Sequence, residues 1–222
     1  MIVEVIATTV EDAIVCELNG ADRIELISSI KEGGLTPSYG LIKQVVEQVE
    51  IPVHVMVRPH SYSFCYSKQD IKIMLEDIKQ IRKLGASGIV VGALTKEHQI
   101  DIATVDRLLS EVGELNVTFH RAFDEVLDQE VELTKLFRFS QINRVLTSGG
   151  KPNVIEGAAQ LQKLVQLTND KQLTILAGGG VTHKNVDSLI AKTGIKEVHV
   201  GSGARFSSQA QNPIDPNLLM QF

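Results

Sequence analysis

The chain repeats a short β-branched segment followed by a helical stretch eight times, and this repeat constrains the fold more than any other feature. The predicted strands cover residues 2–7, 23–28, 53–59, 88–94, 117–123, 142–148, 173–179 and 196–202. Strands that alternate with helices form parallel sheets. Eight such units in 222 residues predict an α/β fold, a closed (β/α)8 TIM-like barrel. We therefore expect a single domain over residues 1–222 whose functional site lies in the loops after the strands.

The last part of the chain predicts a short or incomplete eighth helix. Only residues 206–222 follow the final strand, and Pro213 and Pro216 interrupt them. Apolar surface that a full eighth helix would cover is usually buried by a partner, so we expect a homodimer or higher homo-oligomer at this edge. Elsewhere, Thr36-Pro37 is typical of a helix start and Gly194 of a helix end.

Composition argues against several classes of partner. A net charge of −5 and an aromatic content of 5% without tryptophan do not favour nucleic-acid binding. No apolar run approaches the roughly 20 residues that cross a bilayer, and the N-terminal segment does not resemble a signal peptide. Two distant cysteines fit a reducing compartment. We expect a cytoplasmic protein with no nucleic-acid and no membrane partner.

Polar residues interrupt the predicted strands on the face that should point into the barrel. Side chains two residues apart share a face of a strand, so Val53, Val55 and Val57 together pack against the helices. The same alternation in the other strands leaves charged and imidazole side chains inside. These interior residues are Glu4, Glu25, Arg58, His120 and His199. Because a buried charge without a partner costs several kcal/mol, they should pair with one another or with a ligand.

Three interpretations of the interior residues remain open. They could form an internal ion-pair network, or line a ligand pocket in which carboxylate and imidazole groups share acid–base work. They could also hold a divalent metal through glutamate and histidine, although no local ligand spacing supports a metal site. No predicted strand ends in a lysine, which argues against Schiff-base chemistry.

Glycine-rich loops follow the last three predicted strands and indicate an anion site. Barrels frequently bind phosphate in this region, where bare backbone N–H groups approach an anion closely. The candidate anion-binding residues are Thr147, Ser148, Gly149, Gly179, Gly180, Gly201 and Ser202. The alternative is that these glycines only permit tight turns.

Five motifs stand at or beside the predicted strands. They are NGADRIEL (19–26), KEGGLTPS (31–38), IPVHVMVRP (51–59), VTFHRAFD (117–124) and RVLTSGG (144–150). They resemble the motifs of the CutC family, over about residues 2–205. The resemblance implies a cytoplasmic (β/α)8-like barrel assigned to copper homeostasis and copper binding. Its most typical residues here are Glu25, Arg58, His120, Arg121, Asp124 and the loop 147–149, so Arg121 and Asp124 join the candidate catalytic residues with Glu4 and His199.

The chain departs from the family pattern at two positions. Family members proposed to bind Cu(I) have cysteine where this chain has Ile6 and Ile27. Cu(I) prefers thiolate and thioether ligands, and Cys16 and Cys65 are only weak candidates for a metal site. Two functions remain: a copper-homeostasis protein that binds copper, or an enzyme acting on a small anionic or phosphorylated metabolite at the barrel mouth.

Overall fold

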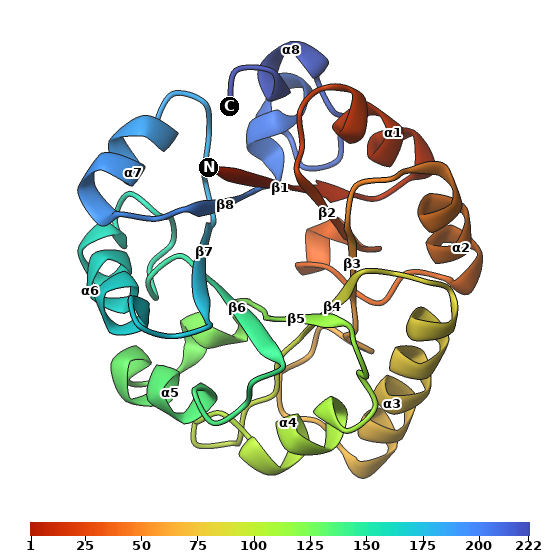
Figure 1. Ribbon diagram of the computed structural model, residues 1–222, viewed down its shortest axis with the longest axis vertical. Coiled ribbons are helices and arrows are strands. Elements are labelled where there is room, and N and C mark those ends of the chain that lie inside the picture. The colour runs from red at the N-terminus through yellow and green to blue at the C-terminus, as the bar shows by residue number, and fades with distance from the viewer.

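The computed structural model describes residues 1–222 and shows a closed barrel of eight parallel strands (Figure 1). The strands are β1 (Ile2–Ala7), β2 (Arg23–Leu26), β3 (Val53–Met56), β4 (Gly88–Val91), β5 (Asn116–Phe119), β6 (Ile142–Thr147), β7 (Thr174–Gly178) and β8 (Glu197–Val200). Each strand pairs with the next, and β8 pairs with β1 to close the barrel. The TIM-like barrel is therefore confirmed. Most strands end earlier than the sequence predicted, because the chain turns there into the loops of the barrel mouth.

The helices form a ring outside the strands (Figure 1). They are α1 (Val10–Leu18), α2 (Tyr39–Gln48), α3 (Lys68–Lys83), α4 (Ile102–Leu109), α5 (Gln129–Leu136), α6 (Ala158–Thr168), α7 (Val186–Thr193) and α8 (Pro216–Leu219). Short 3₁₀ turns cover Ile30–Glu32, Arg121–Glu125, Ser202–Ala204 and Phe206–Ser208. None of the helices combines the length and apolar character that a membrane span requires.

Helix boundaries follow local capping chemistry. α3 begins at a capping box, in which the Ser67 hydroxyl accepts the Asp70 N–H and the Asp70 carboxylate accepts the Ser67 N–H. α2 begins after Ser38, whose hydroxyl accepts the Leu41 N–H, so the helix start predicted at Thr36-Pro37 is wrong. Gly194 ends α7 with a φ of 75°, as predicted.

The main core fills the space between the strands and the ring of helices. α3 buries Ile71, Met74, Ile78 and Ile81, whose spacing places them on one face. The valines on the outward faces of the strands, among them Val53 and Val55, belong to the same core. The strand faces that point into the barrel carry the polar residues and a small apolar cluster that includes Met56 and Val90.

The C-terminal segment closes the barrel with a minimal helix. α8 has four residues, which confirms the predicted short eighth helix, and Ile214 and Leu219 are buried against the core. Arg205 is 2% exposed; its guanidinium donates to the Ile6 carbonyl at 2.8 Å and pairs with Asp12 at 3.0 Å. These contacts tie the end of the chain to β1 and α1. The homo-oligomer expected at this edge stays a prediction.

Candidate functional site

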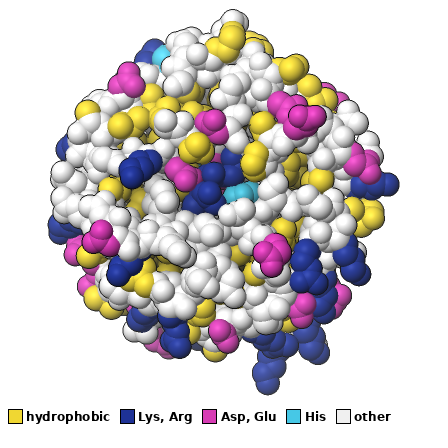
Figure 2. Space-filling view, in the orientation of Figure 1, with side chains coloured by type: hydrophobic (Ala, Val, Ile, Leu, Met, Phe, Trp, Pro, Cys, Tyr) yellow, Lys and Arg dark blue, Asp and Glu magenta, His cyan; other side chains and the backbone are white.

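The interior of the barrel is polar along its axis. Acidic, basic and histidine side chains gather in the central hollow of the face that Figure 2 shows. All five residues that strand alternation placed inside are buried: Glu4, Glu25, Arg58, His120 and His199. They fall into two groups. Glu4 belongs to an ion-pair network at the base of the barrel. The other four residues line a cavity at its mouth.

The first group is a charge network at the base of the barrel. Arg23 Nε lies 2.5 Å from Glu4 and its Nη2 lies 2.6 Å from Glu197, which also pairs with Arg144 Nε at 2.8 Å. Two guanidinium groups thus balance two carboxylates. Strand alternation could have found Arg23, since it shares a face with Glu25, but Arg23, Arg144 and Glu197 were missed. Glu4 is therefore part of an internal ion-pair network, the first of the three interpretations.

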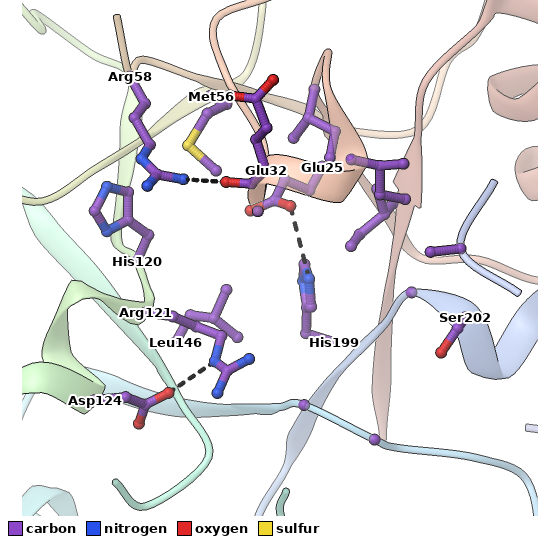
Figure 3. A pocket seen from close by; sticks show the side chains of 18 of the residues that line it. Glu25, Glu32, Met56, Arg58, His120, Arg121, Asp124, Leu146, His199 and Ser202 are labelled. Carbon is purple, nitrogen blue, oxygen red and sulfur yellow. Dashed lines mark hydrogen bonds and ion pairs between the residues drawn. The ribbon is translucent and has the colours of Figure 1, made fainter. Parts of the chain in front are cut away.

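His199 connects this network to the barrel mouth. Its Nδ1 lies 2.7 Å from a Glu4 oxygen, and its Nε2 lies 3.6 Å from Glu25 Oε2. Glu4 is itself held by Arg23, so it fixes the plane of the imidazole. Figure 3 shows Glu25 and His199 facing each other across the middle of the pocket. Glu25 Oε1 is buried without a hydrogen-bond partner.

Burial and neighbouring charges shift the acid–base behaviour of this pair. Burial, assisted by the charge of Glu4, raises the pKa of Glu25 to about 7, against the opposing effect of His199 and Arg23. Burial alone would lower the pKa of His199, but Glu25 and Glu4 outweigh it and raise that pKa above its ordinary value. A hydrogen bond from His199 and the charge of Arg23 overcome burial and hold the pKa of Glu4 well below its usual range. Glu25 therefore exchanges its proton near neutral pH beside an imidazole.

A cavity of about 540 Å³ opens above this pair at the C-terminal ends of the strands. Part of its wall is apolar and consists of Ile6, Ile27, Ile30, Met56, Leu146 and Val181. Six of the seven candidate catalytic residues line it, namely Glu25, Arg58, His120, Arg121, Asp124 and His199. Glu4 lies beneath and does not line it.

The loops after β7 and β8 line the cavity with Gly179, Gly180, Ser202 and Gly203. The amide groups of Gly179 and Gly180 donate to no acceptor within the protein. Gly179 and Gly180 have φ values of 108° and 77°, a region that favours glycine. A Cβ on Gly203 would collide with the Val181 carbonyl oxygen, so the two loops are in contact. Gly179, Gly180, Gly201 and Ser202 all line the cavity, and their role as anion ligands stays a prediction.

The hydrogen-bond donors of the loop after β6 are occupied by acceptors within the protein. Asp124 accepts the amides of Ser148 and Gly150, each at 3.0 Å, as well as the Thr147 hydroxyl. The Gly149 amide donates to Thr147 Oγ1 at 2.9 Å. The expected anion ligands Thr147, Ser148 and Gly149 do not line the cavity, and Asp124 and Thr147 Oγ1 already accept from their donors.

Arg121 adds a positive charge beside the glycine loops. Its Nε pairs with Asp124 at 2.7 Å and its Nη2 donates to Ser148 Oγ at 3.0 Å, which holds the guanidinium at the cavity (Figure 3). A Cβ on Gly179 would meet the Arg121 guanidinium at 3.4 Å. Arg121 and Gly179 therefore lie side by side at the cavity.

Arg58 and His120 line another part of the cavity, together with Phe64. The guanidinium of Arg58 lies 4.6 Å from the Phe64 ring centre, and the imidazole of His120 lies 4.9 Å from it. Burial, assisted by the charge of Arg58, lowers the pKa of His120 to about 3, so its imidazole is neutral. Sequence reasoning missed Phe64, and also Glu32, whose carbonyl accepts from Arg58; both come from loops in which no periodicity marks the side chains.

The residues of the cavity do not fit Cu(I). Cys16 is buried in α1, and burial, with the charge of Asp12, raises the pKa of its thiol to about 12. Cys65 lies in the loop after β3, and neither cysteine lines the cavity. Ile6 and Ile27 line it where the resemblance would place thiolates, which leaves the Met56 thioether as its one sulfur ligand. Glu4, Glu25 and His199 form a group of oxygen and nitrogen donors within 4.8 Å of one another, a set that is harder than Cu(I) prefers.

Comparison with known proteins gives consistent matches. The sequence model of the CutC family matches residues 1–204. A CutC protein of Pasteurella multocida (strain Pm70) is 40% identical over 221 residues, covering 99% of this chain and 88% of that protein. A CutC protein of Yersinia pseudotuberculosis serotype I (strain IP32953) is 44% identical over 200 residues, covering 90% and 78%.

Solved structures agree with these matches. The CutC copper homeostasis protein of Streptococcus agalactiae superimposes with a TM-score of 0.84 at 32% identity, covering 90% of this chain and 97% of that one. Phosphoribosyl anthranilate isomerase of Thermococcus kodakaraensis has a TM-score of 0.64 at 19% identity, covering 100% and 96%. At that identity the second likeness shows the barrel fold alone.

Proposed function

The chain belongs to the CutC family, and we propose that it is an enzyme that binds a small phosphorylated metabolite in the barrel mouth and moves a proton on it. The observation that carries the proposal is the arrangement of one cavity. Unoccupied backbone donors and Arg121 line it, and so do Glu25 and His199. Anion donors beside a buried acid–base pair suit a substrate that is held by its phosphate and reacts elsewhere.

The donors of the two glycine loops would hold the phosphate. Backbone N–H groups without an acceptor bind phosphate oxygens without requiring a side chain, and the nearby Arg121 guanidinium, which Asp124 holds in place, adds a charge-assisted donor. A cavity of about 540 Å³ falls in the range of small-molecule sites.

Glu25 is the residue that would exchange a proton with the substrate. Its Oε1 is buried without a partner, and its raised pKa of about 7 allows it to act as acid or base near neutral pH. Glu4 orients His199 through its Nδ1, and the Nε2 of His199 faces Glu25. This imidazole would stabilise the Glu25 carboxylate when the proton leaves. Glu4 touches neither the cavity nor the substrate and is a positioning residue.

Copper binding, which the family name suggests, gains little support from these residues. The cavity offers one thioether and no cysteine thiol, and the Cys16 thiol stays protonated at neutral pH. We infer that Cu(I) binding is weak and that Cys16→Ser changes it little. Competition with a Cu(I) chelator measures this, and a tight single site would contradict it. The two free cysteines support a cytoplasmic location, which remains our inference.

Binding of matched compounds tests the proposed function. Glycerol 3-phosphate and glycerol differ only in the phosphate, so titration calorimetry and thermal unfolding should show binding of the first alone. At ~100 times its dissociation constant a ligand stabilises by about 2.7 kcal/mol, which raises the melting temperature by roughly 5–10 °C. Arg121→Met should weaken binding by about tenfold or more, since it removes a charge-assisted contact.

Arg107→Met is the matched control, because Arg107 is exposed on α4 and forms no ion pair. It should bind glycerol 3-phosphate as the unmodified protein does. Equal responses to glycerol and glycerol 3-phosphate, or no response to either, would overturn the phosphate site.

A further inference from the structure

Arg58 is a buried cation without a counter-ion. Its side chain lines the cavity and the residue is only 7% exposed, yet no carboxylate pairs with it. Its Nη1 donates to the carbonyls of Glu32 at 2.9 Å and Gly34 at 3.2 Å, while its Nε is buried without an acceptor. Two carbonyl dipoles orient this guanidinium but do not neutralise it. A buried unpaired charge is costly, so a ligand that supplies the missing negative charge would be bound strongly.

His120 presents a second donor to the same cavity. Its Nδ1 accepts the Ala122 N–H at 3.2 Å, which places the imidazole proton on Nε2. That Nε2 is buried and finds no acceptor in the protein. The Phe64 ring contacts both His120 and Arg58, so it holds the two donors together. Arg58 and His120 thus bring two buried donors without acceptors to one side of the cavity, an arrangement that requires an explanation.

We propose that Arg58 and His120 form a second anion subsite for a carboxylate, so that the ligand carries a phosphate at one end and a carboxylate at the other. Figure 3 shows Arg58 and His120 on one side of the pocket, Ser202 on the opposite side, and Glu25 and His199 between them. The inference rests on the proposed function for its phosphate end, and the arginine, the histidine and their empty donors carry the carboxylate end. The substrate class is a small phosphorylated carboxylic acid.

The wall between the two ends fits the carbon skeleton of such a ligand. Ile27 and Met56 pack together with Val90 inside the barrel, and Ile6 and Ile30 pack against them. Ile6, Ile27 and Met56 line the cavity and offer hydrocarbon and thioether surface without hydrogen-bonding groups. A short carbon chain against this wall would have its middle carbons beside Glu25. Donors from Arg58 and His120 would then stabilise negative charge that develops on the carboxylate when Glu25 removes a neighbouring proton.

Two phosphate compounds that differ in the second anionic group test the subsite. 3-Phosphoglycerate carries a carboxylate where glycerol 3-phosphate carries a hydroxymethyl group. Titration calorimetry should give a dissociation constant for 3-phosphoglycerate about tenfold or more below that for glycerol 3-phosphate, as expected for a charge-assisted hydrogen bond. Arg58→Met should reduce this ratio to near one. His120→Phe, which keeps the ring but removes Nε2–H, should reduce it several-fold and serves if Arg58→Met does not fold.

Arg121→Met separates the carboxylate site from a general effect of charge. It removes the same positive charge from the same cavity, but it should weaken both compounds together and leave the ratio as it was. Circular dichroism and melting temperature report whether each variant folds. A ratio near one in the unmodified protein, or a ratio that survives Arg58→Met and His120→Phe, would overturn the carboxylate subsite and leave the phosphate site standing. Failure of both compounds to bind the unmodified protein would overturn the proposed function and the subsite together.

Discussion

The base and the mouth of the barrel are both charged and both buried, but they differ in how their charges are satisfied. At the base, Arg23 and Arg144 balance Glu4 and Glu197 through contacts of 2.5–2.8 Å. His54, close by, has its pKa lowered to about 4 by burial and is neutral. At the mouth, Arg58 has no counter-ion and Glu25 leaves one oxygen without a partner.

The same residue types therefore have a structural role at the base of the barrel and a functional role at its mouth. At the base each charged group faces an opposite charge, although Arg144 Nη1 and His54 Nδ1 also lack a hydrogen-bond partner. At the mouth, Arg58 Nε, His120 Nε2 and Glu25 Oε1 are buried without partners on residues that line the cavity, and the Arg58 guanidinium has no counter-ion. A buried charge without a counter-ion reduces stability, and beside a cavity it indicates that a ligand supplies the missing charge.

The largest expected effect is at the base. Arg23→Met leaves the carboxylate of Glu4 without its guanidinium partner and removes one of the two guanidinium partners of Glu197, so we expect a loss of about 3–5 kcal/mol in the free energy of unfolding. Urea unfolding measures it. The exposed Arg107→Met should change the value by less than about 0.5 kcal/mol. If Arg23→Met unfolds no more readily than Arg107→Met, the base is not a structural network.

An intermediate, pH-dependent effect is expected at Glu25. Its folded-state pKa of about 7 exceeds the ordinary value of 4.5, so its contribution to stability is complete below that ordinary value and is lost as pH rises through about 7. The glutamine of the Glu25→Gln variant cannot ionise, so the variant does not lose this stability as pH rises. The stability of the variant relative to the unmodified protein should therefore rise by about 2 kcal/mol between about pH 5 and about pH 8.5.

Urea unfolding at the two pH values checks the behaviour of Glu25. Glu114→Gln, at an exposed position without an ion pair, should show no such dependence on pH. A constant difference between Glu25→Gln and the unmodified protein would show that Glu25 is ionised throughout the range.

The smallest expected effect on stability belongs to Arg58. Arg58→Met removes a guanidinium that lacks a counter-ion, and the loss of two hydrogen bonds to carbonyls offsets that gain. We expect the free energy of unfolding to change by about 1 kcal/mol or less, in contrast to Arg23→Met. Chemical unfolding of both variants in one buffer makes the comparison. Equal losses would mean that Arg58 is as structural as Arg23.

The architecture followed from local patterns in the sequence. β-Branched runs marked all eight strands, because a strand that is covered by helices needs an apolar outer face. Period-two alternation put Glu4, Glu25 and His199 inside, and it could equally have placed Arg23. The short α8 followed from its prolines. Alternation fails at Phe64 and Glu32, since loops have no period.

The details of the site depended on long-range contacts. Ser148 and Gly180 have similar sequence surroundings, yet the amide of one is occupied by Asp124 and that of the other is free. That distinction depends on where a carboxylate from another loop comes to lie. The pairing of Arg23 with Glu197, 174 residues apart, is likewise invisible to any local pattern. The sequence therefore predicts which residue types gather at the mouth better than it predicts which of them stay unpaired.

The ion pair between Arg205 and Asp12 of α1 affects how the chain folds during its synthesis on the ribosome. Arg205 reaches Asp12 across 193 residues, and β8 supplies the missing neighbour of β1. Until β8 has been synthesised, β1 presents an open strand edge, which is a template for aggregation. A nascent chain that stalls before β8 would keep this edge exposed. We therefore expect the chain to need chaperones most during the last part of its translation.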